Sequence, residues 1–129
     1  MRKPLPFFPR AGMVLVCDFS DFRAPEINKV RPVVVISPRL KGRSDLVSVV
    51  PISTTAPGSE VPYVVKLVRN YAPWGDPVTP TWAKCDIVMT VGRGRLSSFK
   101  VDRRRFVTPE LTGDDLKRVR QGVLRGLGF

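Results

Sequence analysis

Residues 31–37 read RPVVVIS, a short apolar run bounded by Pro32 and Pro38. A continuous run of this length that is rich in valine is typical of a central strand buried on both faces. A second such run, LVSVVPIS, follows at residues 46–53 after a basic turn. These two runs are therefore the expected centre of a β-sheet.

Three more strands are predicted around this centre. They are GMVLVCDF at 12–19, VPYVVKLV at 61–68 and TWAKCDIVMTV at 81–91. The connections are rich in proline and contain no helical pattern, which argues against a doubly wound α/β fold. Residues 92–96 are expected to turn, and residues 97–106 to form one helical turn and then a short edge strand.

The last part of the chain predicts one amphipathic helix. Thr112 can cap its start, and Asp114 and Asp115 in the first turn favour the positive end of the helix dipole. Gly126 and Gly128 are expected to end it. Its apolar residues recur at helical spacing, namely Leu116, Val119, Val123 and Leu127. We therefore predict a mainly β fold with a C-terminal α-helix, in which five or six strands form a small, strongly curved antiparallel sheet or barrel.

The chain has 129 residues, the usual size of one compact domain. We expect a single domain at residues 12–129, after an N-terminal arm at residues 1–11. No apolar run approaches the roughly 20 residues that span a bilayer, and the proline-rich N-terminus is a poor signal peptide. The strand pattern favours Cys17 and Cys85 as isolated buried thiols, with one disulfide between them as the alternative. These features predict a cytoplasmic protein with no membrane partner.

Charge is the strongest global signal in the sequence. Lysine and arginine number 22 against 11 acidic residues, which gives a net charge of +11. Fifteen of the basic residues are arginine, the side chain suited to bidentate contacts with phosphate. This balance predicts a polyanionic partner such as nucleic acid. An acidic protein partner is the alternative, and the two are compatible.

The chain contains no histidine, which excludes Ser-His-Asp and Cys-His nucleophiles and the usual zinc hydrolase site. It also lacks a Walker loop and a dinucleotide fingerprint, and its acidic residues are too scattered for a two-metal nuclease. We therefore expect neither a metal nor a cofactor. Cleavage of RNA needs less, because RNA carries its own nucleophile, the 2′-hydroxyl. A carboxylate, one or two cations and a hydroxyl suffice.

Lys84 and Asp86 stand two residues apart in the last predicted strand, so their side chains should share one face. Their separation along the strand would be roughly 7 Å, enough to straddle a phosphodiester. With Arg31 and Ser53 from other strands, they supply the required groups. The alternative is an ion pair at a sheet edge, which stabilises a fold by less than ~1 kcal/mol.

Four segments of the chain resemble the PemK/MazF family of toxins from type II toxin–antitoxin systems, and in particular a PemK-like branch. They are GMVLVCDF (12–19), EINKVRPVVVIS (26–37), VVPIST (49–54) and WAKCD (82–86). The Arg-Leu pair at 95–96 and the terminal helix follow in the family's order. The resemblance implies an SH3-like barrel, a homodimer and inhibition by an acidic antitoxin. It also implies metal-independent cleavage of single-stranded RNA to a 2′,3′-cyclic phosphate.

The resemblance further implies roles for individual residues. Arg31 matches the arginine that acts at the scissile phosphate, and Ser53 stands at a position whose hydroxyl contacts phosphate. Asp86 matches the aspartate that serves as general base. Lys84 stands where PemK-type enzymes carry an arginine, as proton donor or charge stabiliser. Pro25 occupies the place where some PemK relatives have a histidine.

These two departures leave other functions open, because lysine lacks the bidentate fork of arginine and the assisting imidazole is absent. One alternative is a non-catalytic barrel that binds nucleic acid or protein. Another is a poison of a protein target, as in the gyrase inhibitors that share this barrel. RNA selection is expected in the loops at 20–30, 54–61 and 69–80. The candidate RNA contacts are Arg23, Lys29, Thr54, Thr55 and Trp74.

Several residues have more than one interpretation. Thr54 and Thr55 either assist the neighbouring serine or cap the turn. Three aromatic residues either stack on bases or pack in the core, namely Tyr71, Trp74 and Trp82. The three arginines at 103–105 form a solvated surface, guide phosphate backbones or bind an acidic antitoxin.

Overall fold

The structure is a computed structural model that describes residues 5–43 and 45–129. In chain order its elements are β1 (Val14–Asp18), β2 (Val30–Val35), β3 (Leu46–Ser53), β4 (Val64–Lys66), β5 (Trp82–Lys84), β6 (Met89–Gly92), the 3₁₀-helix η1 (Arg93–Arg95), β7 (Leu96–Ser97), β8 (Phe99–Asp102), β9 (Arg105–Val107) and α1 (Gly113–Gly126). The first residues of the expected N-terminal arm, 1–4, lie outside the described residues.

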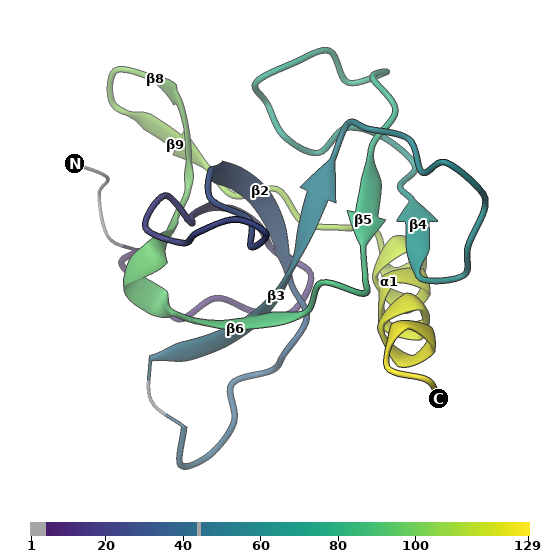
Figure 1. Ribbon diagram of the computed structural model, residues 1–129. Coiled ribbons are helices and arrows are strands. Elements are labelled where there is room, and N and C mark those ends of the chain that lie inside the picture. Colours follow the sequence, from purple (N-terminus) through teal and green to yellow (C-terminus); the bar gives the residue numbers. More distant parts are fainter. Residues whose placement is uncertain (1–4, 44) are drawn as a thin grey trace.

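Seven strands form one antiparallel sheet in the order β4-β5-β3-β2-β1-β7, with β6 pairing with β3. β8 and β9 form a separate hairpin that projects from the sheet, and α1 packs beside β4 (Figure 1). The predicted class, mainly β with a C-terminal helix, is confirmed. Among the described residues the edge strands β4 and β7 do not pair with each other. The curved sheet therefore stays open rather than closing into a barrel.

The run RPVVVIS lies at the centre of the sheet, as predicted. β2 pairs with β1 on one side and β3 on the other, and Val33, Val34 and Val35 are fully buried. Alternate residues of these strands enter two separate apolar clusters on the two faces of the sheet. Helix α1 covers one face, where Val119 joins the first cluster. The N-terminal segment packs on the other face, where Leu5 is buried in the second cluster.

One predicted strand is wrong, because the chain leaves the sheet in the middle of residues 81–91. β5 ends at Lys84, the next four residues turn away, and β6 begins at Met89. A hydrogen bond from Ile87 N to Lys84 O, 3.0 Å long, closes the turn. Lys84 and Asp86 therefore do not share one face of a strand. Within the described structure no ion pair joins them.

The pairing with β3 explains this break. Ala83 lies opposite Ile52, and Met89 lies opposite Val49. Five residues lie between Ala83 and Met89, but only two lie between their partners on β3, Ile52 and Val49. The surplus residues must bulge out of the sheet. Lys84, Asp86 and Thr90 alternate with apolar residues through the bulge, except at Val88, which is why the sequence alone resembles one strand.

Two further expectations are corrected. The strand predicted at 61–68 is reduced to β4, because Val64 N bonds to Val61 O in a turn. Residues 97–106 contain no helical turn and instead supply the end of β7, β8 and most of β9. The helical turn comes earlier, as η1, where only a turn was expected. A tightly wound turn and a short hairpin have no apolar periodicity that would distinguish them in the sequence.

Helix α1 begins as predicted, with Thr112 Oγ1 accepting a hydrogen bond from Asp115 N at 3.1 Å. Asp115 is only 2% exposed, and its carboxylate accepts hydrogen bonds from Val68 N and the Tyr71 hydroxyl, at 3.0 and 2.8 Å. Arg118 completes the network with an ion pair to the same carboxylate. Burial raises the pKa of the Tyr71 phenol, which keeps its proton for this bond. The network ties the loop after β4 to the start of the helix.

Both cysteines are buried, and in the described structure they form no disulfide, as the strand pattern favoured. Burial, with a contribution from the charge of Asp86, raises the pKa of the Cys85 thiol to about 12. This thiol is therefore protonated and inert at neutral pH. The described part of the chain has no helix that is long and apolar enough to cross a bilayer.

Candidate functional site

Three of the expected catalytic residues lie at the ends of neighbouring strands. Arg31 is the second residue of β2, Ser53 is the last of β3, and Lys84 is the last of β5. The pairing of β2 with β3 ends at Val33 and Pro51; beyond it Arg31 pairs with Cys17 of β1, and Ser53 pairs with Trp82 of β5. Side chains two residues apart on a strand point to the same face, so Arg31 lies on the face of Val33 and Ser53 on the face of Pro51. Arg31 and Ser53 therefore share one face of the sheet, at the end where β2 and β3 no longer pair.

The same row continues on the other side of Ser53. Trp82 of β5 pairs with Ser53, and Lys66 of β4 pairs with Trp82. The Lys66 ammonium lies 6.0 Å from the centroid of the indole ring. These residues, Arg31, Ser53, Trp82 and Lys66, form what we call the polar row, which crosses four strands on one face of the sheet. Lys84 follows two residues after Trp82 on β5 and so shares that face.

Asp86 lies outside the polar row, in the turn after β5. Its side chain is exposed, and the described structure gives its carboxylate neither a hydrogen bond nor an ion pair. Its backbone is held by helix α1, because a Cβ on Gly126 would lie 3.0 Å from Asp86 Cα and 3.2 Å from Cys85 O. Few Cβ atoms approach other atoms so closely. Only glycine lets the helix touch this turn.

Gly122, one helical turn earlier, makes a similar contact with the core. A Cβ there would lie 2.9 Å from both Cys85 Sγ and Val65 Cγ2. Gly122 and Gly126 thus form a notch on one face of α1, the glycine notch, that seats Cys85 and the turn. Sequence reasoning missed this role and expected Gly126 only to end the helix. The signal was present, because a glycine inside a helix costs about 1 kcal/mol relative to alanine.

The loop between β1 and β2 carries two of the expected RNA contacts, Arg23 and Lys29, and both are exposed. Lys29 stands two residues before Arg31, and its carbonyl accepts a hydrogen bond from Phe19 N at 3.1 Å. Arg23 and Pro25 lie further from Arg31 along the chain, in the outer turn of the loop. Of the two expected contacts, Lys29 is therefore the one close in sequence to the polar row.

Arg95 ties this loop to the end of η1. Its guanidinium donates to Asp21 Oδ2 at 3.0 Å and to Asp18 O at 3.1 Å, and it lies 4.7 Å from the centroid of the Phe22 ring. The hydrogen bond from Arg95 holds the pKa of Asp21 below its ordinary value of 3.8. Arg95 was expected only as part of the family's Arg-Leu pair, and the structure adds that it fixes the loop in front of β2.

Thr54 and Thr55 begin the loop after β3 and are exposed. Thr55 N donates a hydrogen bond to Ser53 Oγ at 3.0 Å. The serine hydroxyl therefore caps the turn, rather than the threonine side chains. This bond uses the oxygen of Ser53 as an acceptor and leaves its proton available for a phosphate.

Two aromatic residues of the loop between β4 and β5 contact the helix-side cluster rather than the polar row. Trp74 is 53% exposed and meets Phe99 edge-on, with ring centroids 4.9 Å apart. Tyr71 is buried and bonded to Asp115, so its interpretation as a base-stacking residue is wrong. Trp82 is half-buried in the polar row and presents part of its ring to solvent.

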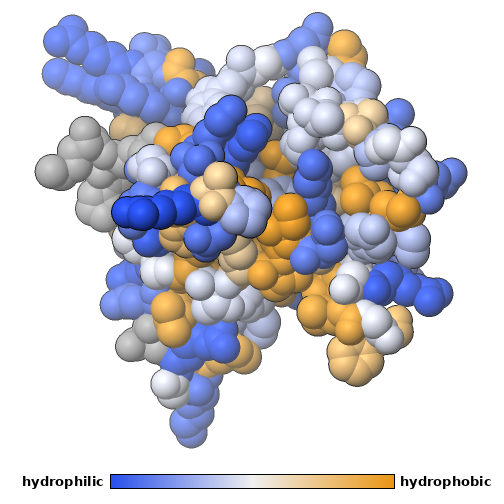
Figure 2. Space-filling view, in the orientation of Figure 1, coloured by the Kyte–Doolittle hydropathy of each residue, from blue (hydrophilic) through white to orange (hydrophobic). Residues whose placement is uncertain are grey.

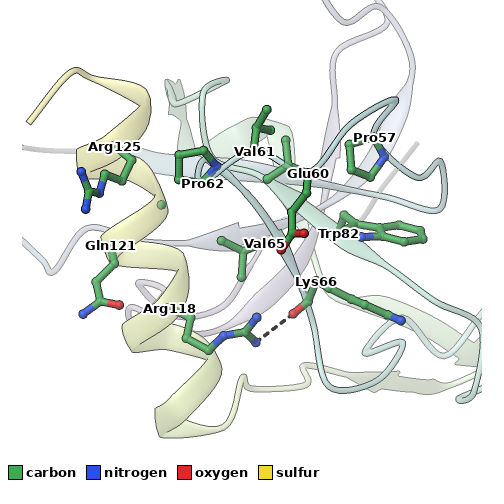
Figure 3. Close-up of a pocket in the computed structure, with 12 residues that line it drawn as sticks. Pro57, Glu60, Val61, Pro62, Val65, Lys66, Trp82, Arg118, Gln121 and Arg125 are labelled. Carbon is green, nitrogen blue, oxygen red and sulfur yellow. Dashed lines mark hydrogen bonds between the residues drawn. The ribbon is translucent and has the colours of Figure 1, made fainter.

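A cavity of about 640 Å³ adjoins the polar row (Figure 3). Trp82 and Lys66 line one side, and Arg118 and Arg125 of helix α1 line the other. Figure 3 shows Glu60, from the loop after β3, between these two walls. An indole ring beside three cations suits an anionic ligand with a flat group. Sequence reasoning did not single out Lys66, whose only signal was its place in a predicted strand.

The chemistry of the site follows from these groups. Among the described residues, no three aspartate, glutamate or cysteine side chains gather as metal ligands would. The polar row instead offers a guanidinium, a hydroxyl and an ammonium, with the Lys84 ammonium on the same face and the carboxylate of Asp86 in the next turn. Such a set can bind a phosphodiester through charge-assisted hydrogen bonds and accept one proton.

Comparison with solved structures shows the same fold in several toxins. MazF (Form-I) from Deinococcus radiodurans has a TM-score of 0.70 and 24% identity, over 95% of this chain and 99% of that chain. An endoribonuclease in complex with its cognate antitoxin from mycobacterial species has a TM-score of 0.64 and 20% identity, over 95% and 97%. Mycobacterium tuberculosis toxin MazF-mt6 has a TM-score of 0.61 and 17% identity, over 88% and 94%. A comparison with curated protein sequences found no match.

A comparison with protein families identifies the chain more directly. Residues 10–125 match the family described as PemK-like, MazF-like toxins of type II toxin–antitoxin systems. This range contains the polar row, Lys84 and Asp86, and it confirms the resemblance found in the sequence. The chain therefore belongs to the PemK-like, MazF-like toxin family of type II toxin–antitoxin systems.

Proposed function

We propose that this protein is a cytoplasmic endoribonuclease toxin that cleaves single-stranded RNA without a metal ion. The observation that carries the proposal is the register of β2, β3 and β5, from which Arg31, Ser53 and Lys84 share one face of the sheet. Family membership and the net charge of +11 support it further. So does the likeness to a solved endoribonuclease that is bound to its cognate antitoxin.

In the proposed reaction, the Asp86 carboxylate takes the proton of a 2′-hydroxyl, whose oxygen attacks the adjacent phosphorus. The Arg31 guanidinium and the Ser53 hydroxyl bind the phosphoryl oxygens and stabilise the added negative charge. Lys84 donates a proton to the leaving 5′-oxygen or stabilises its charge. The products are a 2′,3′-cyclic phosphate and a 5′-hydroxyl.

The rest of the substrate would meet the loops on both sides of the polar row. Lys29 and Arg23 precede Arg31, and the two threonines follow Ser53 at residues 54–55. Cations at these places suit the phosphates of neighbouring nucleotides. We keep Trp74 as a contact for a base further along the strand, because over half of its surface is exposed.

The test is an RNA cleavage assay in EDTA with purified protein. We expect wild type to cut single-stranded RNA and to leave 2′,3′-cyclic phosphate ends, which mass spectrometry identifies. Arg31→Ala and Asp86→Asn should each lower the rate by about 100-fold or more, the usual cost of losing a charge stabiliser or a general base. Arg120→Ala is a matched control, because it removes an exposed arginine from helix α1 without touching the polar row or the loops beside it.

Two outcomes would reject this assignment. Undiminished cleavage by both variants would remove Arg31 and Asp86 from the reaction. Toxicity in cells without RNA cleavage, which survives Asp86→Asn, would indicate a poison of a protein target instead. A homodimer and an acidic antitoxin complete the proposal, and light scattering with and without the product of a neighbouring gene would test both.

A further inference from the structure

The hairpin formed by β8 and β9 carries the densest group of cations in the chain. Lys100, Arg103, Arg104 and Arg105 stand within six residues, with Asp102 as the one carboxylate among them, and all are exposed. Figure 2 shows hydrophilic side chains protruding at the upper left, where Figure 1 places this hairpin. None of the catalytic roles proposed above uses these residues.

Within the described residues, the three arginines of this hairpin form no salt bridge. In the described structure, the side chains of Arg103, Arg104 and Arg105 make no hydrogen bond, ion pair or ring contact. Asp102 is turned to the backbone, since its carboxylate accepts a hydrogen bond from Arg103 N. Other arginines differ, because Arg93 and Arg118 form salt bridges. Three adjacent unpaired arginines repel one another unless a polyanion approaches.

The hairpin is mounted firmly despite its exposed tip. Its two strands meet at a neck where the hydroxyls of Ser98 and Thr108 lie 2.8 Å apart. Phe99 at the base is fully buried, and Trp74 packs edge-on against it. An isolated two-stranded hairpin is only marginally stable in water, so these anchors are needed to hold it in place. The cations are therefore presented by an ordered arm, not by a flexible tail.

The composition of the arm favours RNA over a protein as its partner. Nucleic-acid interfaces are more polar and much more positively charged than protein–protein interfaces. Arginine predominates, and its guanidinium matches phosphate bidentately. Val101 and Phe106 remain 38% and 40% exposed beside the cations. An apolar and aromatic surface next to cations suits the unpaired bases of a single strand.

We infer that the β8–β9 hairpin is an RNA-binding arm that contacts the phosphates of single-stranded RNA outside the reaction centre. This inference rests on the proposed function for the identity of the partner. It assigns Arg103, Arg104 and Arg105 to affinity and leaves the chemical step to the polar row and Asp86.

The test measures binding separately from cleavage. The probe is a fluorescent 2′-O-methyl oligoribonucleotide of mixed sequence, which lacks the nucleophile and therefore cannot be cut by the proposed reaction. The arm variant combines Arg103→Gln, Arg104→Gln and Arg105→Gln. The control variant combines Lys41→Gln, Lys117→Gln and Arg120→Gln, three exposed cations elsewhere, so that both variants lose the same charge. Anisotropy titrations run from about 50 to about 200 mM salt.

Each phosphate contact to a single strand contributes about 0.7 to the slope of log affinity against log salt concentration. We expect the arm variant to lose about 2 units of slope and at least about 10-fold in affinity at low salt, and the control variant to lose much less. Melting curves check that both variants are folded. A double variant at the tip of the hairpin, Arg103→Gln with Arg104→Gln, repeats the test with a smaller disturbance of the strands.

Equal losses in the two variants would overturn the inference, as would an arm variant that binds like wild type. Loss of binding to poly-L-glutamate with RNA binding intact would overturn it in favour of an acidic protein partner. The proposed function fails separately. If wild type binds the probe through the arm but never cuts natural RNA, the arm stands and the nuclease assignment falls.

Discussion

Replacing Gly126 with alanine should separate the position of Asp86 from the stability of the fold. The new Cβ would lie 3.0 Å from Asp86 Cα, whereas non-bonded carbons prefer about 3.5–4.0 Å. The turn or the end of α1 must therefore move by about 0.5–1 Å. A misplacement of this size at a reacting group costs about 10- to 100-fold in rate.

Stability should change much less. Alanine favours a helix by about 1 kcal/mol over glycine, and overpacking costs about 1–3 kcal/mol. The net destabilisation is then at most about 2 kcal/mol, or a fall of about 8 °C in melting temperature for a chain of this size. Gly126→Ala should remain folded at 20 °C, with a lower kcat for RNA cleavage and a nearly unchanged KM.

Gly113→Ala is the matched control, because it adds the same methyl group to the same helix where no atom lies within 4 Å. We expect it to keep full activity and to melt at or above the wild-type temperature. The assay is steady-state cleavage of a fluorogenic RNA in EDTA, with circular dichroism melting on the same samples. Wild-type kcat in Gly126→Ala would refute the reasoning, since it would mean that the helix does not position the turn for catalysis.

Three further outcomes follow from particular contacts. Asp115→Ala should destabilise the fold by about 2–4 kcal/mol in urea unfolding, because it leaves Val68 N and the Tyr71 hydroxyl without their acceptor. The exposed neighbour is the control, and Asp114→Ala should destabilise the fold by less than about 0.5 kcal/mol. Burial raises the pKa of Cys85 from 9.0 to about 12, so between these values the thiol ionises only in the unfolded chain. The free energy of unfolding should therefore fall as the pH rises above 9. Cys85→Ala should lack this pH-dependent loss of stability in the same unfolding series. Arg95→Ala should free the loop that carries Asp21 and raise the KM for RNA, with little change in melting temperature. In wild type the hydrogen bond between Arg95 and Asp21 should weaken as the pH falls below 3.8 through the lowered pKa of Asp21.

The centre of the fold could be predicted from sequence because the valines of residues 31–37 and 46–53 have few alternatives. Buried runs of β-branched residues fit a pleated, two-sided environment and little else. The helix was equally clear, since its cap at Thr112 and its apolar spacing depend on local contacts. These elements also place Arg31 and Ser53, so that part of the candidate site follows from the same pattern.

The position of Asp86 could not be predicted in this way. Lys84, Asp86 and Thr90 alternate with apolar residues between Trp82 and Val91, with Val88 as the exception, and the bulge within this stretch depends on the partner strand β3. Its conformation also depends on Gly122 and Gly126, which lie more than 30 residues later in the chain. Pairing and close packing between distant segments leave only a faint mark in a local pattern, here two glycines inside a helix.

The break between β5 and β6 has a consequence for how the protein can be altered. Each of the two strands keeps its own pairing with β3. Cys85 is still held, because it is buried and its N donates a hydrogen bond to Tyr63 O, whereas residues 86–88 belong to neither register. A residue can therefore be inserted into or deleted from this segment without sliding either strand along its neighbour. Changing the length of this segment would therefore change the distance between the Asp86 carboxylate and Arg31 while the strands of the sheet keep their pairing.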